Sequence, residues 1–178
     1  VFVTAAVREI ATWATAMVVA GVGGTAICAD LGARKIRDEL DAMRVLGVNP
    51  VKQLVVPRML ALAVMAPLLN LVAIVGITLS GVLVMQVLFA VSPAAFLGTF
   101  AANFAPPELF GSVLKTFLFG MIIAVVCCYK GMHASGGAQG VGRAVNQAVV
   151  ISFSALWIFN YAFTSVLLAQ FPALQALR

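Results

Sequence analysis

Long uncharged stretches alternate with one charged segment along this chain. Residues 11–29 contain no Asp, Glu, Lys or Arg, residues 59–107 contain none either, and most of the charge falls between them at 30–58. A helix of about nineteen residues is enough to cross a hydrocarbon core of ~30 Å. The pattern therefore predicts membrane-spanning helices, with a charged loop between the first two.

The uncharged stretch at 59–107 is too long for one span, so the chain has to turn within it. Ser-Pro at 92–93 and Pro-Pro at 106–107 are turn sequences that supply the breaks. The predicted fold class is all-α, a polytopic membrane helix bundle with four transmembrane helices in this chain. The elements expected are helices over about 11–29, 59–88, 108–132 and 143–170, a short outer segment over 93–104, and a glycine-rich connector over 136–142.

Small residues recur at every fourth position of the first predicted span. On a helix such residues form one face, where another helix can approach closely. The three cysteines all lie in apolar stretches without the spacing of a zinc site or a disulfide framework, so we expect them to be small buried core residues. The small residues are Ala16, Ala20, Gly24, Cys28 and Gly32, and the cysteines are Cys28, Cys127 and Cys128.

The charged segment contains a helical pattern of its own. Ile36, Leu40 and Met43 recur at helical spacing, with charged residues on the other side. We predict a short amphipathic helix over 33–46, ended by the glycine and proline that follow it. This helix is too short and too charged to cross a membrane. Its expected ion pairs are Arg34 with Asp38 and Arg37 with Asp41.

Composition and charge support the membrane interpretation. The chain is 63% hydrophobic and 10% charged, whereas soluble domains carry roughly a quarter charged residues. The net charge of +5 does not indicate nucleic-acid binding, because the basic segment lacks interleaved aromatic residues. If 30–58 is cytosolic, Lys130 and Arg143 are cytosolic too, and the outer loop 89–107 has no Lys or Arg, which satisfies the positive-inside rule.

Few residues suggest chemistry. His133 has no second ligand nearby, and the glycine-rich segment lacks the Lys and Ser/Thr of a phosphate loop, so we expect no catalytic site, metal or cofactor in this chain. Arg8 and Glu9 stand near the outer end of the first span, and Lys115 lies one or two turns inside the third. These charges either snorkel to the outer surface, or line a polar outlet or contact an outer partner.

The predicted helix over 33–46 is the most informative element for function. Three acids, Asp38, Glu39 and Asp41, stand among its bases, which is unfavourable for binding to anionic lipid. A helix held between two spans that presents both signs of charge suits docking to a soluble protein. The residues expected at this coupling site are Arg37, Glu39, Leu40, Asp41, Met43, Arg44, Leu46, Gly47 and Pro50, with Arg58 as an anchor at the inner headgroups.

The motifs around this helix resemble those of the MlaE/YrbE permease family. The segment Asp-Leu-Gly-Ala-Arg-Lys-Ile-Arg-Asp-Glu-Leu-Asp at 30–41, the Gly-Val-Asn-Pro at 47–50, and the Gly-Gly-Ala-Gln-Gly-Val-Gly-Arg at 136–143 carry the resemblance, together with Arg-Glu-Ile at 8–10. The sequence of residues 28–34 is similar to that of the actinobacterial YrbE branch, whose members accompany Mce proteins.

The resemblance implies the transmembrane permease subunit of an ABC transporter for lipids, in the Mce branch an importer of fatty acids or sterols. A second YrbE-type subunit, a cytoplasmic ATPase dimer that holds ATP and Mg, and outer MCE-domain proteins would be its partners in the inner (plasma) membrane. Residues 1–178 would form one permease domain that lacks its N-terminal part, with about five spans in the intact chain. Met65, Leu69 and Phe119 are expected in the wall of the lipid pathway.

Two alternatives stay open from the sequence. A stand-alone secondary transporter or channel would need ionisable groups at the membrane midplane, and the chain shows none away from the span ends. A non-transporting membrane scaffold is the second alternative. Neither predicts that an ATPase subunit purifies with this chain.

Overall fold

The computed structural model describes residues 9–103 and 106–170, and these are almost entirely helical. The first rod consists of α2 (Ala11–Val18), the π-helical turn η2 (Val19–Gly24) and α3 (Thr25–Ile36). The elements that follow are α4 (Glu39–Val45), the π-helical turn η3 (Val51–Val55), α5 (Val56–Phe89), α6 (Pro93–Asn103), α7 (Pro106–Met132) and α8 (Gly137–Gln170).

Four of these rods are long and apolar enough to cross a membrane, which confirms the predicted all-α membrane fold. Each contains an uncharged or nearly uncharged stretch that the sequence pattern had already marked. The candidate spans are Ala11–Ile36, Val51–Phe89, Leu109–Met132 and Gly137–Val166.

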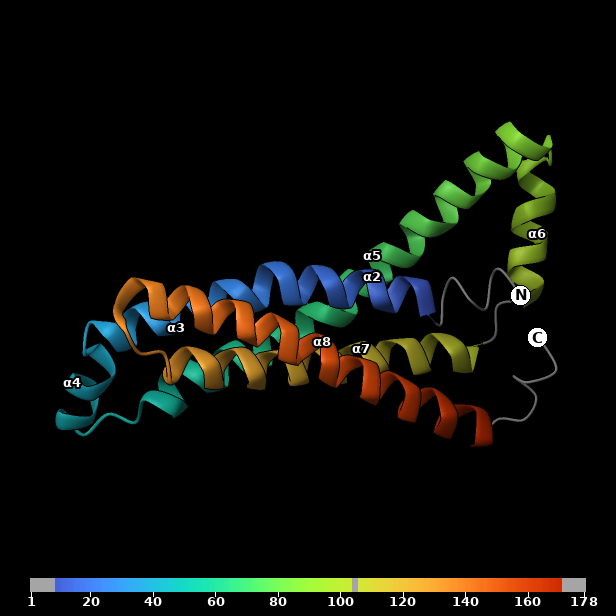
Figure 1. Ribbon diagram of the computed structural model, residues 1–178. Helices are drawn as coiled ribbons and strands as arrows, with labels where there is room; N and C mark the ends of the chain where they lie inside the picture. Colours follow the sequence, from blue (N-terminus) through green and yellow to red (C-terminus); the bar gives the residue numbers. More distant parts are fainter. Residues whose placement is uncertain (1–8, 104–105, 171–178) are drawn as a thin grey trace.

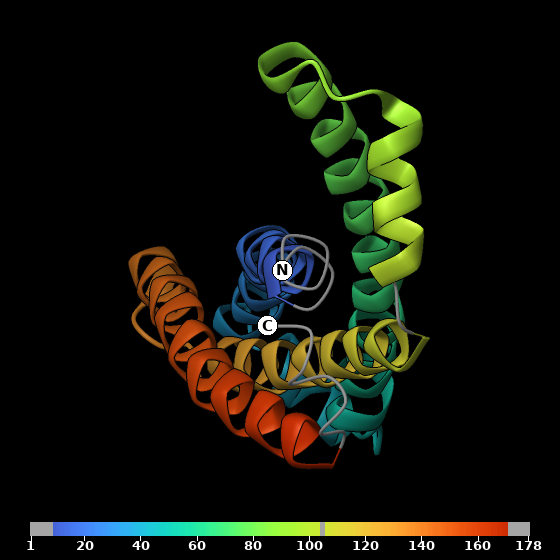
Figure 2. The ribbon, with the colours of Figure 1, turned by 90° about the vertical axis from the view of Figure 1, so that its right-hand side faces the viewer.

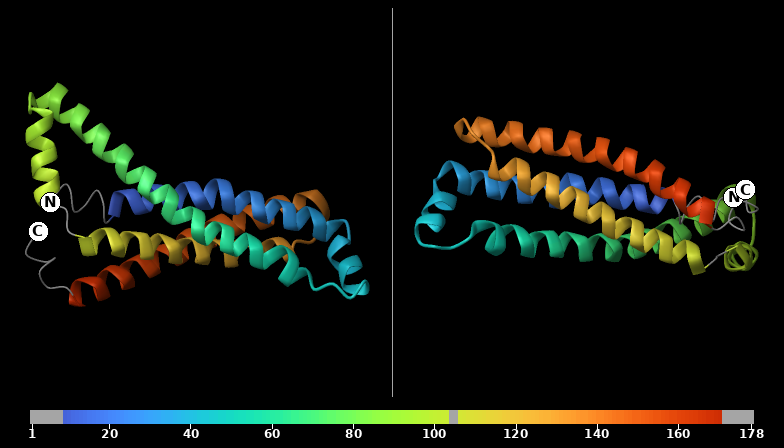
Figure 3. Two further views of the ribbon diagram at one scale, coloured as in Figure 1. Left: turned by 180° about the vertical axis from the view of Figure 1, so that it is seen from behind. Right: turned by 90° about the horizontal axis from the view of Figure 1, so that it is seen from below.

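The rods run side by side along the bundle, with α7 in contact with α3, α5 and α8 (Figure 1). The short helix α4 and the turn from α7 into α8 lie at the same end, called the α4 end below (Figure 3). Towards the opposite end, the second half of α5 leaves the bundle and α6 folds back beside it (Figure 2). The spans therefore form a packed bundle with one projecting arm.

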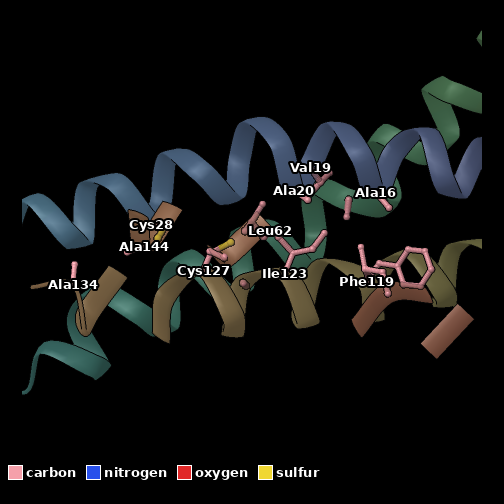
Figure 4. Packing of buried hydrophobic residues seen from close by; sticks show 14 residues of the cluster. Ala16, Val19, Ala20, Cys28, Leu62, Phe119, Ile123, Cys127, Ala134 and Ala144 are labelled. Carbon is pink, nitrogen blue, oxygen red and sulfur yellow. The ribbon is translucent and has the colours of Figure 1, made fainter. Parts of the chain in front are cut away.

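Small side chains allow the rods to approach closely, as the stripe in the first span predicts (Figure 4). Ala16, Ala20 and Cys28 are buried in the core cluster. A Cβ added at Gly24 would lie 2.8 Å from the sulfur of Cys127, so a larger residue would not fit there. All three cysteines are buried, which confirms that they serve as small core residues.

Two predicted elements differ from the structure. The single helix expected over 33–46 is two pieces, because α3 continues to Ile36 and Asp38 adopts a left-handed conformation with φ 58° before α4 begins. Aspartate is among the few residues that tolerate this conformation. The connector expected over 136–142 is instead the first two turns of α8, which starts at Gly137.

Candidate functional site

A short helix crosses the α4 end of the bundle. The chain turns at Asp38 after α3, and it turns again at Gly47 (φ +77°) after α4. Pro50 is buried and starts the turn η3 that leads into α5. These three conformations, set by residue types that favour turns, hold α4 between two spans.

Ion pairs connect α4 to the end of α3. The Lys35 Nζ lies 2.7 Å from the Asp41 carboxylate, and the Arg44 Nη1 lies 2.8 Å from the same group. Arg37 and Arg34 both contact the Glu39 carboxylate, at 2.7 Å and 3.5 Å. The pairs expected between Arg34 and Asp38 and between Arg37 and Asp41 were therefore wrong. They assumed one continuous helix, and the left-handed residue rotates α4 out of that register.

The pKa of Asp41 is lowered from its ordinary value. The hydrogen bond from Lys35 is the largest cause, and the positive charge of Arg44 adds to it. Asp41 is therefore ionised across the neutral range and pairs with both bases. Together with the pairs of Glu39, it gives α4 a defined orientation relative to α3.

The apolar residues of this segment point in different directions. Leu40 is buried, so it fixes α4 to the bundle. Val45 and Leu46 are 87% and 78% exposed at the tip of the loop. An adjacent cavity of about 350 Å³ is lined by Arg44, Gly47 and the residues up to Val51. The loop therefore presents two exposed apolar side chains beside a cavity, and such a surface is suited to a protein partner.

Sequence analysis missed Val45 as part of this surface. It named Leu46 but placed the apolar stripe on one face of a continuous helix. Since α4 ends at Val45, the last two apolar residues leave the buried face. The sequence signal for this surface was the pair of consecutive apolar residues directly before Gly47.

Arg58 has a different environment from the one predicted. Its guanidinium forms an ion pair with Asp30 of α3, and Arg34 contacts the same carboxylate at 3.3 Å. The side chain of Arg58 is 24% exposed. Arg58 therefore ties the start of α5 to α3, and its role as an anchor at the inner headgroups stays a prediction.

A buried charge lies in the half of the bundle away from α4. Lys115 on α7 is only 2% exposed, and its Nζ lies 3.1 Å from Glu9 Oε2 and 3.4 Å from the Thr164 hydroxyl. Asn160 and Thr164 of α8 also donate to Glu9, at 3.3 Å and 3.1 Å. Lys115 thus does not snorkel to the surface, and it belongs to a polar cluster that joins three helices. The other predicted outer residue, Arg8, lies outside the described residues.

A second polar contact accompanies this cluster. The Asn70 amide on α5 donates to the Ser112 hydroxyl on α7 at 2.7 Å, and both residues are buried. Sequence analysis did not single out Asn70, although a lone amide in an uncharged apolar run is a signal for bonding between helices.

The three residues predicted for the lipid pathway do not share one surface. Met65 and Leu69 are exposed on α5, although Ala66 and Asn70 beside them are buried. Phe119 is 1% exposed and packs inside the bundle, with its ring centroid 6.2 Å from that of Trp13 and 6.0 Å from that of Phe159. Phe119 thus lies on the face of α7 that meets α2 and α8, and its place in the wall of the lipid pathway stays a prediction.

Comparisons with known proteins agree with this architecture. The family model described as permease MlaE matches residues 1–166. A probable ABC transporter permease protein of Synechocystis sp. is 37% identical over 164 residues, covering 92% of this chain and 62% of that protein.

Other relatives come from a plant and a second bacterium. The chloroplastic protein TRIGALACTOSYLDIACYLGLYCEROL 1 of Arabidopsis thaliana is 31% identical over 89% of this chain and 45% of its own length. A probable ABC transporter permease protein of Rickettsia prowazekii is 32% identical over 93% of this chain and 64% of its own length. The chain thus spans less than two thirds of the length of each of these relatives.

Proposed function

We propose that this chain, which belongs to the permease MlaE family, is the membrane-spanning subunit of an ATP-driven lipid transporter. Its relatives include proteins named as probable ABC transporter permeases, and the plant relative is named for a galactolipid. ATP would be hydrolysed by a separate cytoplasmic ATPase dimer, so this chain needs no ATP or Mg site of its own. The membrane would be the inner (plasma) membrane.

The observation that carries the proposal is the exposed tip of α4. Val45 and Leu46 are almost fully exposed, and the cavity of about 350 Å³ lies beside them. The positive-inside rule predicts that this end faces the cytosol, where lipid would not cover the two apolar side chains. A docked ATPase subunit would bury them.

The ion pairs explain how such a contact could transmit force. A partner that pushes on a flexible loop would only deform the loop. Here Leu40 is buried and Asp41 and Glu39 are paired with bases of α3, so α4 would move together with the first span. The link between Arg58 and Asp30 would extend that movement to α5.

The experiment is co-purification of the ATPase with the full-length permease. Leu46→Asp places a charge on the exposed tip without disturbing the fold, because the side chain packs against almost nothing. We expect it to reduce the amount of bound ATPase and the ATP-dependent lipid uptake by about tenfold or more. Ala138→Asp is the matched control, since Ala138 is exposed near the start of α8 at the same end but outside the α4 loop. Normal ATPase binding by Leu46→Asp would contradict the proposal.

Reversal of both Glu39 and Asp41 to Lys tests the second part of the mechanism. It breaks the pairs with α3 and leaves Val45 and Leu46 in place. We expect weaker transport per bound ATPase, measured as lipid moved per ATP hydrolysed. An unchanged ratio would argue against transmission through α4.

The lipid pathway is proposed along the exposed apolar side of α5, between this chain and a second YrbE-type subunit. Met65 and Leu69 lie on that side, and the outer half of the helix is exposed as well. Fatty acids or sterols are the proposed cargo, received from MCE-domain proteins on the outer side. A photoactivatable fatty acid should label α5 of the assembled complex, and labelling restricted to other chains would exclude this pathway.

An ion-coupled secondary transporter is the alternative that the Lys115–Glu9 pair could serve. Lys115 is the seventh residue of the span Leu109–Met132, about 10 Å along the helix and short of its midpoint. Uptake into vesicles without ATP, driven by a proton or sodium gradient, would favour the alternative. Uptake that requires ATP and the co-purified ATPase would support the ABC permease.

A further inference from the structure

A polar cavity lies at the α4 end, between the end of α7 and the start of α8. Its volume is about 310 Å³. Lys130 of α7, His133 directly after α7 and Arg143 of α8 all line it, together with Gln147 and Ser135. None of the described residues that line the cavity is acidic, so it concentrates positive charge.

The acids nearby do not neutralise this charge. Asp30, Glu39 and Asp41 each form ion pairs with bases of α3, α4 or α5, as described above. Within 9–103 and 106–170, neither Lys130 nor Arg143 is recorded in an ion pair. The bases of α3 and α4 are therefore balanced by acids, whereas those of the cavity are not.

The side chains of the cavity are held in place by neutral groups. The Lys130 ammonium donates to Gln147 Oε1 at 3.1 Å, which leaves two of its three N–H donors for another acceptor. His133 Nδ1 lies 2.8 Å from the Tyr129 carbonyl oxygen, and since a carbonyl only accepts, the nitrogen is the donor. The His133 and Tyr129 rings are also in contact, tilted by 33° with centroids 4.3 Å apart.

Arg143 is accommodated by a glycine. A Cβ added at Gly136 would lie 3.1 Å from the guanidinium, and Gly136 has φ +89°, a conformation that other residues rarely adopt. The turn between α7 and α8 thus leaves space for the guanidinium beside the cavity.

We propose that this cavity binds the phosphate group of an anionic lipid from the cytosolic leaflet. The cavity lies where the spans α7 and α8 end, which is the depth of the lipid headgroups. An arginine fork and a lysine ammonium are the usual ligands of phosphate, and the positive end of the α8 dipole lies close by. The space holds a phosphate group and several waters, at about 30 Å³ for each water. The bound lipid would be resident, separate from the transported cargo, so the inference does not rest on the proposed transport.

The test is lipid binding by the purified full-length permease with its co-purifying chains. The delipidated protein is titrated with phosphatidylglycerol or phosphatidylcholine and the bound lipid is counted by native mass spectrometry. We expect a preference for phosphatidylglycerol, and about tenfold weaker phosphatidylglycerol binding in the Lys130→Gln/Arg143→Gln variant. Lys52→Gln is the matched control, because Lys52 is an exposed base at the same end outside the cavity. It should bind phosphatidylglycerol as the unaltered protein does.

Several outcomes would overturn the inference. Equal phosphatidylglycerol binding by the unaltered protein and the double variant would do so, as would an equal loss in the Lys52 control. If the double variant does not fold, Arg143→Gln and Arg143→Lys replace it, and binding should fall in the first and largely persist in the second. The protein could also retain radiolabelled inorganic phosphate and show no preference for phosphatidylglycerol over phosphatidylcholine. That result would overturn the proposal that the bound phosphate group belongs to a lipid.

Discussion

The contact between α7 and α5 at Gly120 should be a packing position that is sensitive to substitution. A Cβ added to Gly120 would lie 2.6 Å from the carbonyl oxygen of Leu62 and 3.1 Å from both the Ala63 Cα and the Ala66 Cβ. The nearest of these atoms is backbone, so no side chain can rotate away. Gly120→Ala must therefore move one helix relative to the other.

The size of the effect follows from these distances. Real Cβ contacts are essentially never shorter than 3.0 Å, so relief of the 2.6 Å contact requires a shift of at least 0.4 Å, the difference between the two. A gap of 0.5–1 Å along an interface already removes about a quarter to a half of the dispersion energy of the atoms that separate. Overpacking of this kind typically lowers the free energy of unfolding by about 1–3 kcal/mol.

The assay is reversible unfolding of the purified chain from mixed micelles by a denaturing detergent, followed by circular dichroism. Gly76→Ala is the matched control, because nothing lies within 4 Å of a Cβ added there. We expect the control to unfold at the same detergent fraction or slightly later, since alanine favours a helix over glycine. Equal stability of Gly120→Ala and the control would refute the close crossing of α5 and α7.

The remaining predictions concern two charged contacts. Lys115→Met should lower the free energy of unfolding by about 3 kcal/mol, because it removes the ammonium from a partly buried Glu9 carboxylate. The double variant with Glu9→Gln should recover most of this loss. Equal losses in the single and double variants would argue against the pair. The lowered pKa of Asp41 means that its pair with Lys35 stabilises the fold above the unfolded-state pKa and is lost as the pH falls through the lower folded-state pKa. Hydrogen exchange in α4, corrected for the intrinsic rate, should therefore rise below about pH 4, and Asp41→Asn should not show this rise.

The spans were predictable because hydropathy and length are local properties of the chain. Residues 11–29 and 59–88 are uncharged, and each lies inside an observed span. Helix caps and turns are local too, so Pro93 and Gly47 marked real boundaries. The cysteines were predictable for the same reason, since a small apolar residue in a membrane helix that packs against others is normally buried.

The shape of the α4 loop was not predictable from periodicity. A helical pattern over 33–46 fits one helix or two, because one left-handed residue changes the direction of the chain without changing the spacing of apolar residues. The φ of Asp38 decides which ion pairs form, and the end of α4 at Val45 decides that Val45 and Leu46 face the exterior.

Contacts between distant residues also required the three-dimensional structure. Glu9 and Lys115 are separated by 106 positions, and their pairing depends on how three helices are rotated about their axes. Phe119 and Met65 are both apolar residues of spans, yet one is buried and the other exposed. Amino-acid sequence sets which segments enter the membrane, because transfer from water to lipid depends on each segment alone. Packing sets which face of each helix is covered, because that depends on the neighbours the fold supplies.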